Sequence, residues 1–221
     1  MISFYSVVIL GEHNLSRKYD QTGAAKRTEI AIEEIIIHKD YQKTFQRGAG
    51  PHDIALIRVK EPIPFYNVQN KKSSNVIPIC LPWNINDPGR QIYHGERLKV
   101  LGWGKTTNDN TAAYDSYKRI GAGSNILQQL DVPAISNRKC KTYLNLNNLN
   151  SRGQLCAGAE EGKDSCGGDS GGPLIKRAHI GTPWFQTGVV SFGSSQCGTG
   201  YPGVYTRVAA YLTWIEENLK P

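Results

Sequence analysis

Ten residues of this chain, DSCGGDSGGP from Asp164 to Pro173, predict a tightly folded loop that carries the hydroxyl group of Ser170. Four glycines and a final proline are unfavourable in a helix interior, and two aspartates are unfavourable in a buried strand. The small residues on both sides of Ser170 match the pattern of a strained nucleophile turn. Because a serine hydroxyl is a poor nucleophile without a neighbouring base, the next question is where a histidine lies.

The order of residues along the chain separates two catalytic designs that use such a turn. An α/β-hydrolase places its acid and then its histidine after the serine. No aspartate follows Ser170, and His179 is the only histidine that does. The chain order therefore excludes that design and leaves the one in which histidine and aspartate precede the serine.

Further motifs occur in a fixed order around this loop: HDIALIRV, IPICLP, VLGWGKT, QLCAG and VVSFGSSQCGTGYPGVYTRV, followed by a C-terminal segment that carries Trp214. Together they resemble the chymotrypsin-type serine endopeptidases over nearly the whole chain, from about Val8 to Leu219. The ICLP and LGEHNLS stretches are most similar to the arthropod clip-domain proteases of clotting and melanisation cascades. The resemblance implies an all-β fold of two six-stranded antiparallel barrels, with the active site in the crevice between them and a helix at the C-terminus.

The resemblance also implies roles for residues at the matching positions. Ser170 would be the nucleophile, and the backbone N–H groups of Gly168 and Ser170 would form the oxyanion hole. Asp53 would orient the catalytic histidine. Asp169 would pair with an amino terminus freed by activation cleavage.

Substrate selection is implied by four more positions. Asp164 matches the floor of the primary specificity pocket, Gly193 and Gly203 match its walls, and Ser191 is expected among the substrate-binding residues. A buried carboxylate favours a partner of opposite charge, so cleavage after Arg or Lys is expected. Any one of these residues alone would be interpreted as a surface aspartate or a turn residue. The prediction of cleavage after Arg or Lys depends on their occurring together at the matching positions.

The catalytic histidine that the resemblance implies is missing from its expected position. No Ala-Ala-His-Cys-like motif precedes LGEHNLS. His52 adjoins Asp53, but neighbours on a strand point to opposite faces, so it should not pair with that carboxylate. All five histidines are expected to be ordinary surface residues: His13, His38, His52, His94 and His179. We expect an N-terminally truncated protease whose first barrel is incomplete and which is inactive as written. The alternative is a non-catalytic protease homologue that binds partners in a cascade.

Five cysteines lie in a glycine-rich chain without a C-x-x-C pair or zinc spacing, which favours disulfides and an oxidising compartment over a metal cluster. The resemblance implies the pairs Cys140–Cys156 and Cys166–Cys197, with Cys80 bonded to a missing pro-region. No cofactor is expected. Glu12 and Asn14 lie in a stretch that matches a calcium-binding loop of some relatives, so structural calcium stays an option, and Asn14 also begins an N-glycosylation sequon.

The 221 residues carry a net charge of +7 at pH 7, but the basic residues are scattered and show no basic helix. Nucleic-acid binding is therefore disfavoured, and no apolar run is long enough to span a membrane. The apolar N-terminus lacks a basic region and a cleavage site, so secretion is expected from the family and not from a signal peptide. The expected partners are protein substrates with Arg or Lys at the cleavage site.

Short β-branched runs between turn signals predict strands at Val7–Leu10, Ile30–Ile37, Ile54–Val59, Leu98–Leu101, Gly188–Phe192 and Gly203–Val208. Helical periodicity predicts a final helix over Val208–Leu219, and a second helix is plausible around Ser136–Leu144, capped by Ser136 or Asn137. We expect a partial first barrel over about 1–95, a second barrel over about 96–207 and the helix over 208–219.

Overall fold

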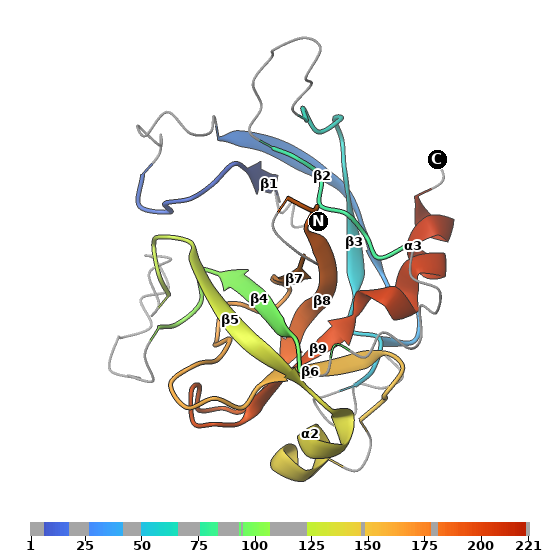
Figure 1. The fold of residues 1–221 in the computed structure, drawn as a ribbon. Coiled ribbons are helices and arrows are strands. Elements are labelled where there is room, and N and C mark those ends of the chain that lie inside the picture. The colour runs from blue at the N-terminus through green and yellow to red at the C-terminus, as the bar shows by residue number, and fades with distance from the viewer. Residues whose placement is uncertain are drawn as a thin grey trace, which may run out of the picture. The chain divides into compact units, whose positions relative to one another are not determined.

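A computed structural model describes residues 7–17, 27–41, 50–65, 76–83, 93, 95–106, 123–146, 149–177 and 181–219 (Figure 1). His94 and His179 lie outside the described residues. The described elements are β1 (Val7–Leu10), β2 (Thr28–Ile37), β3 (Ala55–Val59), β4 (Arg97–Gly102), β5 (Gln128–Ile135), α2 (Asn137–Leu144), β6 (Gln154–Gly158), β7 (Pro173–Lys176), β8 (Phe185–Phe192), β9 (Pro202–Arg207), a 3₁₀ turn η2 (Val208–Tyr211) and α3 (Leu212–Asn218).

The chain divides into two compact units. The first holds β1, β2 and β3, which form an antiparallel sheet in that order. Its register places Val8 opposite Ile30 and Ile35 opposite Ile57. The long strand β2 is rich in isoleucine, as expected of a residue type that fits a pleated sheet.

The second unit contains a closed antiparallel barrel with the strand order β4-β5-β6-β9-β8-β7. Its core is filled by the inward-facing side chains of these strands, among them Leu98, Val132, Leu174 and Tyr205, each at most 1% exposed. Closure leaves the barrel without a free edge, which is how all-β folds avoid edge-to-edge pairing. The segment His38–Ile54 belongs to this unit although the first unit's strands flank it in sequence.

The predicted all-β class and the C-terminal helix are confirmed, with differences in detail. Strands β5, β6 and β7 are present but are absent from the predicted set, because each combines few β-branched residues with proline, glycine or glutamine. The final helix begins as a 3₁₀ turn before α3. Helix α2 starts where predicted, with the Ser136 hydroxyl accepting a hydrogen bond from the Lys139 N–H at 3.3 Å.

Candidate active site

The loop that carries Ser170 is held in place by the carboxylate of its neighbour. Ser170 itself is exposed at the turn before β7. One carboxylate oxygen of Asp169 accepts a hydrogen bond from the Gly104 N–H at 2.8 Å, and the other accepts one from the Cys166 N–H at 2.9 Å. A Cβ added to Gly102 would lie 1.9 Å from Asp169 Oδ1, so the glycines of the LGWG motif make room for this carboxylate. Sequence reasoning missed this contact.

The backbone around the serine leaves two donors available. Gly168 has a φ of +101°, a conformation that L side chains rarely adopt, and a Cβ there would lie 3.2 Å from the Gly104 Cα. Within the described part of the chain, no group accepts a hydrogen bond from the N–H of Gly168 or Ser170. Two such free N–H groups beside an exposed hydroxyl can stabilise a developing oxyanion.

The barrel holds Asp53 through two adjacent strands. The Ser191 hydroxyl, from β8, donates to Asp53 Oδ2 at 2.7 Å, and the Thr206 hydroxyl, from β9, donates to the backbone oxygen of Asp53 at 2.6 Å. Ser191 was expected among the substrate-binding residues, and here its hydroxyl contacts the carboxylate. Thr206 was not anticipated, because a threonine in a strand gives no signal of such a contact.

The two described histidines of the second unit, His38 and His52, do not reach the serine or the aspartate carboxylate. No hydrogen bond joins either of them to Ser170 Oγ or Asp53 Oδ in the ranges that the structure covers. The prediction that His52 does not pair with Asp53 is confirmed, but not for the expected reason: both residues precede strand β3, and the ring of His52 contacts Tyr211 instead. The prediction that every histidine is an ordinary surface residue is wrong for His38. Its exposure is only 8%, because it packs against His52 and two aromatic rings.

Asp164 lines a cavity of about 370 Å³ that also contains Asp169, Lys105, Gly102 and Gly198. Burial raises the pKa of Asp164 to about 6. The negative charge of Asp169 adds to this, while backbone N–H groups, including that of Gly198 at 3.4 Å, oppose it. No Lys or Arg of the described segments forms an ion pair with Asp164.

The two glycines expected beside Asp164 do not line this cavity. Gly193 and Gly203 instead lie against each other, since a Cβ added to Gly193 would be 3.6 Å from the Gly203 Cα. Beneath Gly203 lies the fully buried ring of Tyr205, whose hydroxyl is 3.2 Å from Ser165 Oγ. Burial raises the pKa of Tyr205 to about 12, so the phenol stays protonated.

Two disulfides brace the second unit, Cys140–Cys156 and Cys166–Cys197, which are the pairs implied by the resemblance. The second one ties the serine loop to the segment that follows β8. Cys80 is a free, exposed thiol in the structure. Its backbone is held firmly, because its N–H donates to the Trp184 oxygen and its oxygen accepts from the Gln186 N–H.

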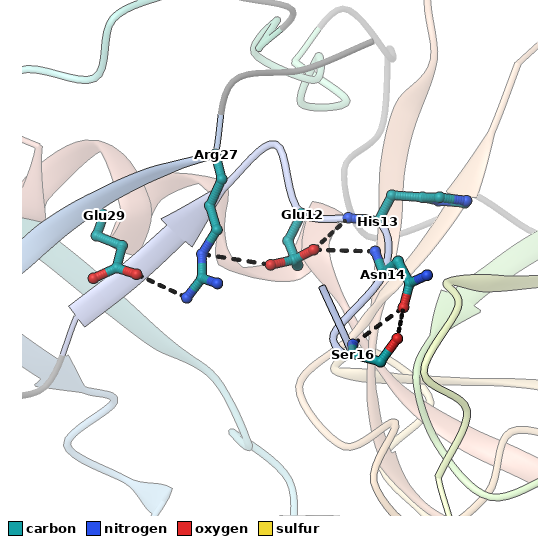
Figure 2. A network of polar contacts seen from close by, with 6 residues as sticks. All are labelled: Glu12, His13, Asn14, Ser16, Arg27 and Glu29. Atoms are coloured by element: carbon teal, nitrogen blue, oxygen red, sulfur yellow. Dashed lines mark hydrogen bonds and ion pairs between the residues drawn. The ribbon is translucent and has the colours of Figure 1, made fainter. Parts of the chain in front are cut away.

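Figure 2 shows how the stretch that matches a calcium loop uses its polar groups. Glu12 Oε1 accepts from the N–H groups of His13 and Asn14, each at 3.0 Å, and Glu12 Oε2 lies 3.5 Å from Arg27 Nε. The Asn14 side-chain oxygen accepts from both the N–H and the hydroxyl of Ser16. The two expected ligands are thus engaged with neighbours, and the guanidinium of Arg27 supplies positive charge to Glu12.

The described residues contain no group of three or more His, Cys, Asp or Glu side chains that could hold a metal ion. In the same residues, no helix has both the length and the apolar character needed to cross a membrane.

Comparison with known proteins identifies the family. The family model for trypsin matches residues 4–215. The chain is 40% identical over 223 residues to phenoloxidase-activating factor 1 of Holotrichia diomphalia, covering 97% of this chain and 53% of that protein. It is 35% identical over 225 residues to serine protease 7 of Drosophila melanogaster, covering 100% and 51%, and 33% identical over 220 residues to the CLIP domain-containing serine protease HP8 of Bombyx mori, covering 97% and 54%. The chain therefore spans about half the length of these relatives, and it belongs to the trypsin family.

Proposed function

We propose that this chain carries most of the active site of a secreted serine endopeptidase that cleaves after Arg or Lys in an extracellular cascade. The observation that carries the proposal is the serine loop: an exposed Ser170 beside two free N–H groups, with the half-buried Asp164 six residues earlier. The relatives include a phenoloxidase-activating factor and a CLIP domain-containing protease, whose names support a cascade role for this chain. No cofactor is proposed, because acyl transfer of this kind uses only protein groups.

In the proposed mechanism, the hydroxyl of Ser170 attacks the carbonyl carbon of the scissile peptide bond and passes its proton to a histidine. The N–H groups of Gly168 and Ser170 stabilise the oxyanion that forms. Asp53, oriented by Ser191 and Thr206, holds the histidine and stabilises its charged form. The histidine then protonates the leaving amine, and water releases the acyl group by the reverse sequence of proton transfers.

The general base is proposed to come from outside these 221 residues, in a longer polypeptide. Support comes from the absence of the expected motif in the sequence and from His38 and His52, neither of which forms a described hydrogen bond to Ser170 or the Asp53 carboxylate. Without a base, only about 10³–10⁴-fold catalysis over water would remain. We therefore expect this chain alone to react little with a fluorophosphonate probe.

Asp164 is proposed to select the substrate. Its burial raises its pKa, which means that the carboxylate lacks enough compensation for its negative charge. A lysyl or arginyl side chain would supply the missing charge. The proposal requires that this side chain can reach the Asp164 carboxylate in the active enzyme.

Two further proposals concern parts of the longer protein. Cys80, a free and exposed thiol, is proposed to bond to a cysteine of a pro-region. Asp169 is proposed to receive the amino terminus made by activation cleavage, since it lines the cavity and now accepts only backbone N–H groups.

Reporter peptides test the proposed function. The longer polypeptide, with its histidine segment, should hydrolyse arginyl and lysyl reporters and not leucyl ones, and Ser170→Ala should abolish the activity. Equal turnover of arginyl and leucyl reporters would contradict the proposed specificity.

A non-catalytic homologue is the second candidate, favoured by the same lack of a described histidine at Ser170. Such a protein would not react with a fluorophosphonate probe even in the longer form. Labelling of the longer form that disappears in Ser170→Ala would exclude this candidate.

A further inference from the structure

Two histidines stack on each other directly beside Asp53. The ring centroids of His38 and His52 lie 4.8 Å apart with an angle of 16° between the ring planes. The ring of Tyr211 meets both edge-on, at 5.4 Å and 5.7 Å, and Trp214 packs on His38 at 5.0 Å. All four residues belong to the second unit. The cluster is an aromatic support under the chain segment that carries Asp53.

The hydrogen bonds of the cluster favour a neutral imidazole at His38. Nδ1 of His38 accepts the N–H of Asp40 at 3.2 Å, so this nitrogen must keep its lone pair. The Tyr211 hydroxyl accepts the backbone N–H of His52 at 3.1 Å and lies within hydrogen-bond distance of His52 Nδ1, at 3.3 Å. Burial raises the pKa of Tyr211, which keeps the hydroxyl proton on the phenol.

A full imidazolium carries a proton on both ring nitrogens, so protonating His38 turns its Nδ1 into a donor facing the N–H of Asp40. Burial, and then His52, lower the pKa of His38 from 6.5. Lys39 lowers it further, and Asp40 opposes the shift. Among the described residues, the charge of Asp53 acts on Tyr211 and on Tyr41, whose backbone N–H donates to the oxygen of His38 at 3.0 Å.

The cluster is joined to Asp53 through the backbone. His52 has a φ of +71°, unusual for a side-chain-bearing residue, and its oxygen accepts the N–H of Ile54 at 2.8 Å, so that Asp53 lies at the tip of the turn. The N–H of His38 in turn donates to the oxygen of Ile54 at 3.1 Å. Movement of either ring therefore acts on the turn that presents the Asp53 carboxylate.

We propose that the stacked rings of His38 and His52, with the hydroxyl of Tyr211, are a proton-sensitive positioning device for Asp53. In the neutral state they hold the left-handed turn at His52 and aim the carboxylate at Ser191. Protonation breaks the Asp40–His38 hydrogen bond, separates the rings and releases the turn. The inference rests on the proposed function for the importance of Asp53, but its test does not require activity.

Amide hydrogen exchange of the whole chain tests the device directly. The N–H groups of Ile54 and His38, which close the turn, should exchange faster at about pH 5 than at about pH 7.5 after correction for the intrinsic rates. A loss of protection of about tenfold or more is expected, the equivalent of one pKa unit. Protection of the Val189 N–H in the barrel should change far less. Equal protection of the turn at both pH values would overturn the proposal.

His38→Asn is the matched variant, because an asparagine oxygen can accept the Asp40 N–H at the place of Nδ1 but does not titrate. It should remove the pH dependence of the Ile54 exchange, and His13→Asn, at an exposed site in the first unit, should leave it unchanged. If His38→Asn does not fold, an NMR titration of the imidazoles in the unmodified chain tests the proposal in its place. The proposal predicts that the Asp53 and Ser191 amide signals shift together with the His38 ring, and independent titrations would refute it. Failure of the proposed protease function would leave these readouts unaffected.

Discussion

Glu12 in the first unit and Asp164 in the second are both acids in sheltered loops, and the structure balances their charges differently. The side chain of Glu12 is 8% exposed, and two N–H groups and the guanidinium of Arg27 surround its carboxylate (Figure 2). Asp164 has backbone N–H contacts but no described cation, and burial raises its pKa to about 6. A sheltered carboxylate with its own cation has its negative charge compensated, whereas one without a cation is held at a cost and is suited to receive a cation from a ligand.

The largest expected effect is the change in substrate selectivity when the charge of Asp164 is removed. In the longer, histidine-containing protein, Asp164→Asn should lower kcat/KM for arginyl reporters by about 10²–10³-fold, because breaking a buried ion pair costs roughly 3–5 kcal/mol and some solvent compensates. Turnover of leucyl reporters, however slow, should not fall. A variant that retains its preference for arginine would show that Asp164 is not the selecting charge.

The packing around the carboxylate of Asp169, also in the serine loop, can be tested by a steric substitution. Gly102→Ala should destabilise the chain by roughly 2–4 kcal/mol in urea unfolding, since its Cβ would overlap the Asp169 carboxylate. Gly167→Ala is the matched control, because its Cβ would lie 3.7 Å from the nearest atom, a Lys105 methylene, at ordinary contact distance. Equal effects of the two substitutions would contradict the tight packing around Asp169.

The cation of the Glu12 loop can be removed without touching the acid. Arg27→Met should cost about 1–2 kcal/mol in the same assay, because it leaves the sheltered Glu12 carboxylate without its cation and also removes the exposed pair to Glu29 at 2.7 Å. Arg58→Met removes a shorter but exposed ion pair, to Glu34 at 2.6 Å, and should change stability by less than about 0.5 kcal/mol. Added calcium should leave the midpoint of the unmodified chain unchanged, and a clear rise would show that the loop binds the ion despite Arg27.

The sequence was informative where a motif constrains the backbone, and less so where contacts come from distant segments. The GGDSGG and HDIAL motifs located Ser170 and Asp53, and the polar N-cap of α2 was readable because capping is a local interaction. The contacts of Ser191 and Thr206 with Asp53 join residues more than 130 positions apart, so no local pattern announces them.

The misreading of His38 has the same origin. Its neighbours, IIIH followed by KDY, look like a strand end at the surface. The rings that bury it come from His52, Tyr211 and Trp214, and their approach depends on tertiary packing that overrides the local pattern. The cation of the Glu12 loop was hidden in a similar way, because Arg27 lies fifteen positions after Glu12.

The most direct test compares two isosteric substitutions, Asp164→Asn and Glu12→Gln, by urea unfolding of this chain near pH 7.5. A folded-state pKa raised above the 3.8 of the unfolded chain means that the native protein binds the proton more tightly, so Asp164 lowers stability as the pH rises through about 6. Asp164→Asn should therefore raise the free energy of unfolding, by about 1 kcal/mol, and the gain should vanish below about pH 4. Glu12→Gln should lower it. Destabilisation by both substitutions would contradict the claim that Asp164 is held without a cation of its own.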